Sequence, residues 1–315
     1  MGSHRRTFIT GSAGVIGRQL TADLLKSGHD VLAIDREPMP DGDWSSLRFE
    51  QGDLSEMDLS LVVDFDPGTV FHLAASFERS EESPEYWGVG WRDDVVASHR
   101  VLDAVKSASP NLSFVFASSY LVYDPAQYML EDPDTERGAL DERSRIGPRN
   151  LCGAGKYYTE RELSYIKATS RPDWRIISAR IYRSYGRGSR DVISRWVRAG
   201  LDGGRIEVFN RANRFDYVYA DDVASSLIHL AEAADAEGVF NVASGTATSI
   251  DEVLSLLTSM GIVEPSKIDD LGDTGLHEAS IADVSRLREA TGWTPSTPLE
   301  AGIRQLAAAM DPSSV

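Results

Sequence analysis

The sequence contains one cysteine, Cys152, and therefore no pair that could form an intrachain disulfide. It has no apolar run of the roughly 18 residues that a membrane helix needs, so no membrane span is expected. Its first segment, MGSHRRTFIT, lacks the apolar core of an export signal. We therefore expect a protein of the reducing cytoplasm.

Basic residues are also in deficit, because 32 Lys and Arg residues stand against 49 Asp and Glu residues, which gives a net charge of −17. Nucleic acids and anionic lipid surfaces select basic proteins, so neither is expected as a partner. No set of residues is predicted to bind a metal ion. At 315 residues the chain is long enough for two modest domains.

Short β-branched and apolar segments alternate with helical patterns through the first part of the chain. This alternation predicts βαβ units, and hence a Rossmann-like, doubly wound α/β fold around a parallel sheet. Amphipathic patterns predict helices over Val15–Ser27, Asp94–Ala108 and Asn150–Lys167. The expected strands are Thr7–Thr10, Val31–Asp35, Leu47–Glu50, Thr69–Ala74, Ser113–Ala117 and Arg175–Ile181.

The pattern changes beyond Gly186, where we expect a smaller C-terminal α/β domain that binds the substrate. Ser249 and Glu252 have the spacing of a helix capping box, and their helix should stop near Gly261. The other expected elements are the helices Ile193–Leu201, Asp221–Ala234, Asp283–Thr291 and Leu299–Met310 and the strands Ile206–Phe209 and Val239–Ala243.

These patterns divide the chain into two domains. Residues 1–182, with a returning segment of about 214–243, are assigned to the domain that binds the cofactor. Residues 183–213 and 244–315 are assigned to the substrate-binding domain.

A glycine-rich loop, Thr10-Gly-Ser-Ala-Gly-Val-Ile-Gly17, directly follows the first expected strand and opens the first helix. Glycines let the backbone turn sharply and approach a pyrophosphate, which rests on the amides at the start of the helix. Asp35 ends the second strand, near the offset at which an acid meets the adenosine ribose of a dinucleotide. Its carboxylate favours NAD because it would repel the 2′-phosphate of NADP, whereas Arg36 beside it weakens that exclusion.

Further motifs follow in order along almost the whole chain. They include the TGxxGxxG loop itself, Gly52-Asp-Leu54, His72-Leu-Ala-Ala75, Ala117-Ser-Ser-Tyr-Leu-Val-Tyr123, Arg180-Ile-Tyr-Arg-Ser-Tyr-Gly186, Asp216-Tyr-Val-Tyr-Ala-Asp-Asp222, Val239-Phe-Asn-Val-Ala-Ser-Gly245 and Gly292-Trp-Thr-Pro295. This ordered set resembles the extended short-chain dehydrogenases/reductases, in particular the NAD-dependent nucleotide-sugar epimerases and dehydratases.

The resemblance implies a set of residues that hold NAD. Asp94 stands where the family has an Asn near the nicotinamide, and Tyr182 stands where an aromatic flanks the ring. The cofactor residues that it implies are Gly11, Gly14, Val15, Ile16, Gly17, Asp35, Arg36, Asp53, Leu54, Leu73, Ala74, Ala75, Ala117, Lys156 and Tyr182.

The same resemblance locates the catalytic positions. The family carries a Tyr and a Lys four residues apart, which places both on one face of a helix. Lys156 matches the Lys, one of only five lysines in the chain, and Ser119 matches the Ser or Thr that binds the reacting oxygen. The position of the Tyr, however, is occupied by Cys152.

This replacement leaves three interpretations open. Cys152 acts as base or nucleophile, since a neighbouring cation lowers a thiol pKa, although its side chain is much shorter than that of Tyr. Alternatively another residue supplies the phenol, and Tyr120 is the candidate. In the third interpretation the usual chemistry is lost and Cys152 is a small buried thiol.

On the substrate side, arginines crowd one segment of an otherwise acidic chain. Guanidinium groups suit phosphate or carboxylate, so Arg183, Arg190 and Arg214 are the candidate residues for binding an anionic substrate. Ser119, which matches the residue that binds the reacting oxygen, is the fourth candidate for substrate binding. The two diphosphate-clamping arginines of the family are not matched: Phe215 holds the first place, and no Lys or Arg lies between Lys267 and Arg286.

The function that the resemblance implies is an NAD-dependent nucleotide-sugar epimerase or dehydratase that removes a hydride transiently to form a keto-sugar. The alternatives are an altered or inactive relative that binds NAD and a nucleotide sugar, and an NAD(P)H reductase of a non-nucleotide anionic substrate. A homodimer through the helices Asp94–Ala108 and Asn150–Lys167 is implied in the same way.

Overall fold

The computed structural model describes residues 6–76, 83–107, 110–135 and 137–310. Its centre is a seven-stranded sheet in the order β11-β7-β5-β4-β1-β2-β3, and each neighbouring pair is parallel. The strands are β1 (Arg6–Thr10), β2 (Asp30–Asp35), β3 (Arg48–Gln51), β4 (Thr69–His72), β5 (Ser113–Ser119), β7 (Arg175–Ile181) and β11 (Gly238–Val242). The strand order reverses at β1, and ligands of such sheets bind beyond the carboxyl ends of the strands at this point.

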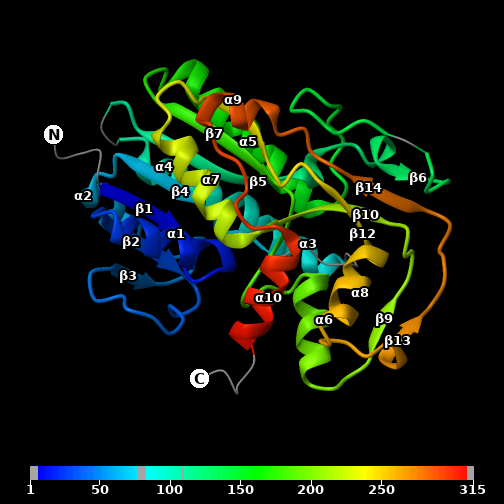
Figure 1. The fold of residues 1–315 in the computed structure, drawn as a ribbon. Coiled ribbons are helices and arrows are strands. Elements are labelled where there is room, and N and C mark those ends of the chain that lie inside the picture. The colour runs from blue at the N-terminus through cyan, green and yellow to red at the C-terminus, as the bar shows by residue number, and fades with distance from the viewer. Residues whose placement is uncertain (1–5, 77–82, 108–109, 136, 311–315) are drawn as a thin grey trace.

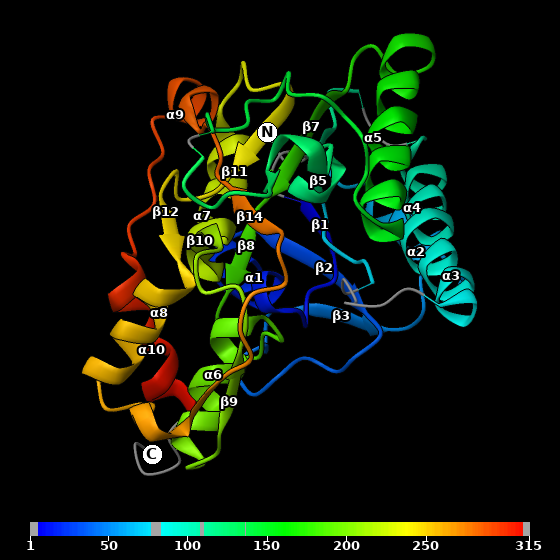
Figure 2. The same ribbon diagram turned by 90° about the vertical axis from the view of Figure 1, so that its right-hand side faces the viewer.

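Helices cover both faces of this sheet (Figure 2). One core joins the sheet to α1 (Val15–Lys26), α7 (Ala220–Glu232) and α9 (Ser285–Thr291). The opposite core joins it to α2 (Ser60–Phe65), α4 (Ala97–Val105) and α5 (Leu151–Thr169). Successive strand residues enter opposite cores: Phe114 and Phe116 enter one, and Val115 between them enters the other. Both faces of each central strand are therefore apolar, which is the sequence pattern of a buried parallel sheet.

A second group of elements packs beside the carboxyl ends of these strands (Figure 1). Its sheet has the order β12-β10-β14-β6, with β8 also paired to β10. Helices α6, α8 and α10 share one core with β10, built on side chains such as Trp196, Leu254 and Ile303. The bounds are β6 (Met129–Leu130), β8 (Arg183–Tyr185), α6 (Val192–Leu201), β9 (Ile206–Val208), β10 (Arg214–Tyr219), β12 (Ala247–Ser249), α8 (Ile250–Ser259), β13 (Ile268–Asp270), β14 (His277–Ser280) and α10 (Leu299–Met310).

The predicted Rossmann-like fold is confirmed, and most predicted elements lie within two residues of the observed ones. The capping box at Ser249 and Glu252 is present, and the helix ends at Ser259, before Gly261 with its positive φ of 70°. The predicted helix Asp94–Ala108 differs most. Its first three residues belong to a π-helical segment, η2 (Trp91–Val96), which continues α3 (Pro84–Gly90), and its predicted end, Ala108, lies outside the described residues. An α-helical period could not reveal this change of winding.

The returning segment of about 214–243 contributes to both groups of elements. Its helix α7 packs on α1, and its strand β11 completes the main sheet beside β7. Its first strand, β10, pairs instead with β8, β12 and β14 in the second sheet. The strand β10 was not predicted as an element, although the sequence analysis lists the motif Asp216–Asp222, which begins within it.

Candidate active site

The glycine-rich loop connects β1 to α1 at the reversal of the strand order. Gly11 has a φ of 74°, and a Cβ atom there would lie 2.7 Å from the backbone N of Ala74. A Cβ on Gly17 would lie 2.0 Å from the carbonyl O of Gly11. Gly14 is the N-cap of α1, and no side chain caps it. The first amides of α1 therefore lie open to a bound anion, and the close packing of the loop requires glycine.

A cavity of about 340 Å³ begins at this loop. Asp35 forms part of its wall and is fixed by the loop, because its Oδ2 accepts a hydrogen bond of 2.8 Å from the backbone N–H of Ala13. The lining residues named by the sequence analysis are Gly11, Gly14, Asp35, Arg36, Asp53, Leu54, Leu73, Ala74 and Ala75, and the others are Ala13, Glu37, Gly52, Asp93, Ala97 and Arg190. A pyrophosphate-binding helix start, a ribose-binding acid and an apolar wall fit a dinucleotide such as NAD.

Lys156 is buried on the face of α5 that packs against β5. Its Nζ donates to the carbonyl O of Ala117 at 2.6 Å and lies 4.9 Å from the centre of the Phe116 ring. Burial lowers the pKa of Lys156, and the charge of Asp94 partly opposes this shift. Asp94 is itself buried, which raises its pKa, and it accepts hydrogen bonds from Ser76 N at 2.6 Å and Ser76 Oγ at 2.7 Å.

Helix α5 is anchored one turn beyond Lys156 by a buried ion pair. Glu160 accepts from Arg180 Nε at 3.0 Å and from Arg180 Nη2 at 2.7 Å, and Ser118 Oγ donates to it at 2.5 Å. Breaking such a pair by removing one partner costs about 3–5 kcal/mol. These contacts with β5 and β7 fix the position of α5 along the two strands, and with it the position of Lys156.

Cys152 lies one turn before Lys156 on the same buried face of α5. It packs in a cluster with Tyr120, Leu121 and Tyr182, and its charge, when ionised, acts on the ammonium of Lys156. Gly153 follows it because α5 approaches the chain at Leu121 closely: a Cβ there would lie 2.4 Å from the Leu121 carbonyl O. The structure thus brings Cys152 and Lys156 together, as their spacing predicts.

Ser119 and Tyr120 end β5 and begin the short 3-10 turn η3 (Tyr120–Val122). Ser119 Oγ accepts from Leu121 N at 3.2 Å. The ring of Tyr120 stacks on Tyr182, with centroids 5.1 Å apart, and burial raises the pKa of Tyr182 well above its ordinary value. The Tyr120 hydroxyl donates to Glu278 Oε1 at 3.2 Å, so it is directed toward β14.

Glu278 is a buried carboxylate that the sequence analysis did not identify. Arg149 Nη1 donates to its Oε2 at 2.5 Å, Arg183 Nη2 at 3.1 Å, and Ser280 Oγ donates to its Oε1 at 2.8 Å. Burial alone would raise the pKa of Glu278, but the two guanidinium groups lower it. The one signal in the sequence was a carboxylate within the small and apolar residues of Leu276–Ala282.

The three candidate arginines for the substrate do not form one cluster. Arg183 lies over the Phe215 ring at 4.1 Å and is paired with Glu278. Arg190 lines the cavity of the glycine-rich loop instead. Arg214 is exposed at the start of β10, and its charge acts on Glu252. Arg149, which sequence reasoning missed, is the arginine that shares a carboxylate with Arg183.

His72, at the end of β4, makes the free energy of unfolding of the protein depend on pH. It is fully buried between Thr10 Oγ1 at 2.6 Å and Ser98 Oγ at 2.8 Å, and burial lowers its pKa to about 3. Below a pH of about 6.5 the imidazole of His72 binds a proton in the unfolded chain, whereas in the folded chain it stays neutral. Stability is therefore present above that pH and is lost as the pH falls toward 3.

Between pH 7.5 and 5.0 this group should remove about 2 kcal/mol from the free energy of unfolding. Urea unfolding at the two pH values measures the loss, and His72→Gln should show a correspondingly smaller one. His229→Gln, which changes an exposed histidine of α7, is the control and should behave as wild type. Equal pH dependence in wild type and His72→Gln would contradict the buried neutral state.

In the part of the chain that the structure describes, no helix is both long and apolar enough to cross a membrane. Within the same residues, no three His, Cys, Asp or Glu side chains are grouped to hold a metal ion.

Comparison with known proteins shows which family and which solved structures this chain resembles. The profile of the "NAD dependent epimerase/dehydratase family" matches residues 7–243. The UDP-glucose 4-epimerase of Mycolicibacterium smegmatis is 28% identical over 320 residues, covering 95% of this chain and 96% of the relative. The GDP-6-deoxy-D-mannose reductase of Pseudomonas aeruginosa is 26% identical over 322 residues, covering 96% of both chains. Among solved structures, MoeE5 in complex with UDP-glucose and NAD is similar with a TM-score of 0.84 and 29% identity, over 98% of this chain and 100% of that chain.

Proposed function

This chain belongs to the NAD-dependent epimerase/dehydratase family, and we propose that it inverts a carbon of a nucleotide sugar, with a UDP-hexose as the substrate to test first. The observation that carries the proposal is the pairing of Lys156 and Cys152 on the buried face of α5, at the carboxyl end of β5. The cavity of the glycine-rich loop is lined by residues at and just beyond the carboxyl ends of β1, β2 and β4, and β5 is the next strand beside β4. A dinucleotide bound in this cavity would extend across the strand ends toward Lys156 and Cys152.

The amides of Val15, Ile16 and Gly17 would hold the pyrophosphate, and Asp35 the adenosine ribose. Lys156 would hold the second ribose. When bound, NAD supplies a reversible hydride acceptor, so that an alcohol can be oxidised and the ketone reduced again from its other face. The chain itself must bind the sugar, move one proton and exclude water.

We assign removal of the proton from the sugar hydroxyl that is oxidised to the Sγ of Cys152. Ser119 Oγ would donate a hydrogen bond to the oxygen of that hydroxyl. A thiolate is a competent base, and the ammonium of Lys156 favours that form by its charge. Tyr120 is the weaker candidate, because its hydroxyl donates to Glu278. Since Arg183 and Arg149 lower the pKa of Glu278, that carboxylate is a poor acceptor for the Tyr120 proton.

The direct test is to incubate the purified protein with NAD and UDP-glucose and to follow the sugar by proton NMR. Appearance of UDP-galactose without net formation of NADH is the expected result. UDP-glucuronic acid, which another MoeE5 structure contains, is the second substrate to try. Tight binding of both nucleotide sugars without any turnover would contradict the proposal.

A reductase is the second candidate, and two observations favour it. The two diphosphate-clamping arginines of the family are not matched in this sequence, and one relative of similar identity is a GDP-6-deoxy-D-mannose reductase. A reductase would consume NADH or NADPH in stoichiometric amounts with a keto-sugar. An epimerase would leave the cofactor unchanged, so absorbance of the reduced nicotinamide distinguishes the two.

We also propose that two copies of the chain associate through the face formed by α3, η2 and α5. Four large aromatic side chains are exposed there: Trp87 (55%), Trp91 (58%), Tyr158 (49%) and Tyr165 (71%). These elements contact one another, and the rings of Trp91 and Tyr158 are 6.1 Å apart. An exposed aromatic face of this kind is typical of a protein interface, and a second copy offers an identical face to it.

Light scattering after size-exclusion chromatography should give twice the chain mass for wild type. Tyr165→Glu combined with Trp91→Glu should give the mass of one chain, because two charges would be buried at the interface. Phe209→Glu, which changes an aromatic of similar exposure (54%) outside this face, should remain a dimer. A wild-type monomer would contradict the proposal.

A further inference from the structure

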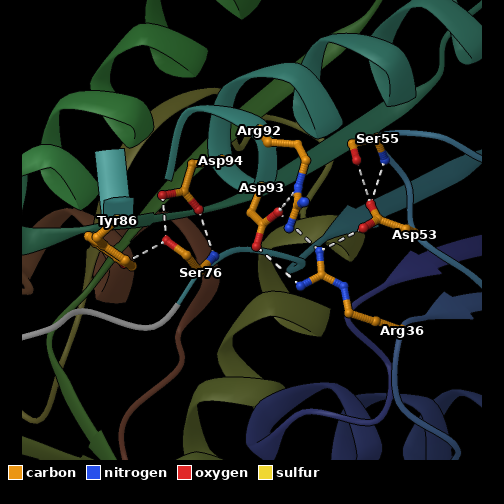
Figure 3. Close-up of polar contacts among 8 residues, drawn as sticks. All are labelled: Arg36, Asp53, Ser55, Ser76, Tyr86, Arg92, Asp93 and Asp94. Carbon is orange, nitrogen blue, oxygen red and sulfur yellow. Dashed lines mark hydrogen bonds and ion pairs between the residues drawn. The ribbon is translucent and has the colours of Figure 1, made fainter. Parts of the chain in front are cut away.

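Two consecutive aspartates on η2, Asp93 and Asp94, are both buried beside the candidate active site. Neighbouring side chains of a helix diverge, and Figure 3 shows the result: Asp94 is directed at Ser76, whereas Asp93 is directed at Arg36. Asp93 lies among the residues that line the cavity of the glycine-rich loop, together with Asp35 and Asp53. The sequence resemblance assigns no role to it.

Asp93 holds the guanidinium of Arg36 in a two-point contact. Nη1 of Arg36 donates to Oδ2 of Asp93 at 3.1 Å, and Nη2 donates to Oδ1 at 3.1 Å. The hydrogen bonds to Asp93 are the main reason why the pKa of Arg36 is raised. The side chain of Asp93 is 8% exposed and that of Arg36 is 49% exposed, so a buried carboxylate holds a guanidinium at the surface of the cavity. Such forked pairs are the strong ion pairs of proteins.

The other side of the guanidinium is held by Asp53, whose Oδ2 is 3.2 Å from Nη2 of Arg36. Asp53 cannot turn away easily, because its Oδ1 accepts from Ser55 N at 2.9 Å and from Ser55 Oγ at 2.7 Å. Arg92 Nε also donates to Asp93, at 2.9 Å. Arg36 is therefore fixed between carboxylates from two separate segments of the chain (Figure 3).

This arrangement bears on which dinucleotide the cavity accepts. A cofactor with a 2′-phosphate on its adenosine ribose needs a guanidinium near the ribose-binding acid, and Arg36 is the residue next to Asp35. Its contacts are instead made with Asp93 and Asp53. Glu37 lines the same cavity, so a 2′-phosphate beside Asp35 would meet a second carboxylate and an Arg36 that is already paired, and Arg190 is the other arginine of the lining.

We propose that Asp93 is a specificity-determining residue, which holds Arg36 on η2 and thereby makes the cavity selective for NAD over NADP. It acts through Arg36 and is a positioning residue. The inference uses the cofactor of the family but is independent of the sugar, of the reaction and of the role of Cys152.

The test measures binding of NAD⁺ and NADP⁺ separately to the purified full-length chain by calorimetry, without sugar. Wild type should bind NAD⁺ more tightly. Asp93→Asn keeps the size of the side chain but not its charge, and it should lower the ratio of the NADP⁺ to the NAD⁺ dissociation constant at least about tenfold. Asp58→Asn, an exposed aspartate outside the cavity, is the matched control and should leave the ratio unchanged.

Two arginine variants separate the role of Arg36 from a simple loss of negative charge. Adding Arg36→Ala to Asp93→Asn should abolish the gain in NADP⁺ affinity. Arg36→Ala alone should leave NADP⁺ binding as weak as in wild type, and in this variant the buried Asp93 keeps its ion pair with Arg92. The proposal is overturned if Arg36→Ala alone lowers NADP⁺ affinity tenfold, or if the double variant retains the gain. It is also overturned if Asp93→Asn binds NAD⁺ normally at an unchanged ratio. Absence of binding to either dinucleotide in wild type would overturn it together with the family's cofactor.

Discussion

Lys156→Met should lower turnover of the nucleotide sugar about 1,000-fold, the largest single effect that we expect. The variant removes the ammonium that stabilises ionised Cys152 and that would hold the cofactor ribose. Methionine keeps the length of the side chain, and loss of a buried charge relieves a desolvation cost, since burial lowers the pKa of Lys156. The free energy of unfolding should therefore not fall by more than about 1–2 kcal/mol, the cost of the lost bond to Ala117 O.

Lys167→Met is the matched control, because it removes a lysine from the last turn of the same helix. Lys167 donates to Trp174 O and Glu237, at the amino-terminal edge of the sheet and away from the glycine-rich loop. The turnover of Lys167→Met should stay within about twofold of wild type, since surface ion pairs contribute little to stability. If Lys156→Met retained more than a tenth of the wild-type rate, Lys156 would not have the assigned role.

Cys152→Ala should lower turnover about 100-fold and leave the dissociation constant of NAD unchanged. The thiol occupies the usual Tyr position, one turn from Lys156 on the same buried face of α5, and alanine removes it without adding bulk. Measuring kcat at saturating sugar together with NAD affinity distinguishes lost proton transfer from lost binding. Unchanged kcat would exclude Cys152 as the base and return the assignment to Tyr120.

Cys152→Tyr tests the same position in the opposite direction. Restoring the family's phenol should raise turnover at least about tenfold, because the longer side chain carries its hydroxyl closer to the sugar oxygen. The outcome that would contradict our proposal is activity in this variant alone, with none in wild type. The chain would then be a binding protein for NAD and a nucleotide sugar.

The cofactor half of the molecule was predictable because its signals are local. A strand, the turn at Gly11, the helix start at Gly14 and the acid at Asp35 all lie within residues 6–35. Each is required by backbone geometry or by the charge of a dinucleotide, so no distant contact is needed to recognise it. The spacing of Cys152 and Lys156 is local in the same sense, because two residues four apart on a helix lie on the same face.

The charged contacts of the site were decided only by the tertiary structure. Glu278 meets Arg149 and Arg183 across 129 and 95 residues of the chain, and Arg36 meets Asp93 across 57. No periodicity of the sequence encodes which carboxylate a guanidinium will reach, because this depends on how separate elements pack. The sequence by itself therefore determined the fold, the family and the cofactor. Only the packing of η2 beside the cavity and the pairing of β14 in the second sheet decided that Arg36 and Arg183 bind carboxylates of the chain itself.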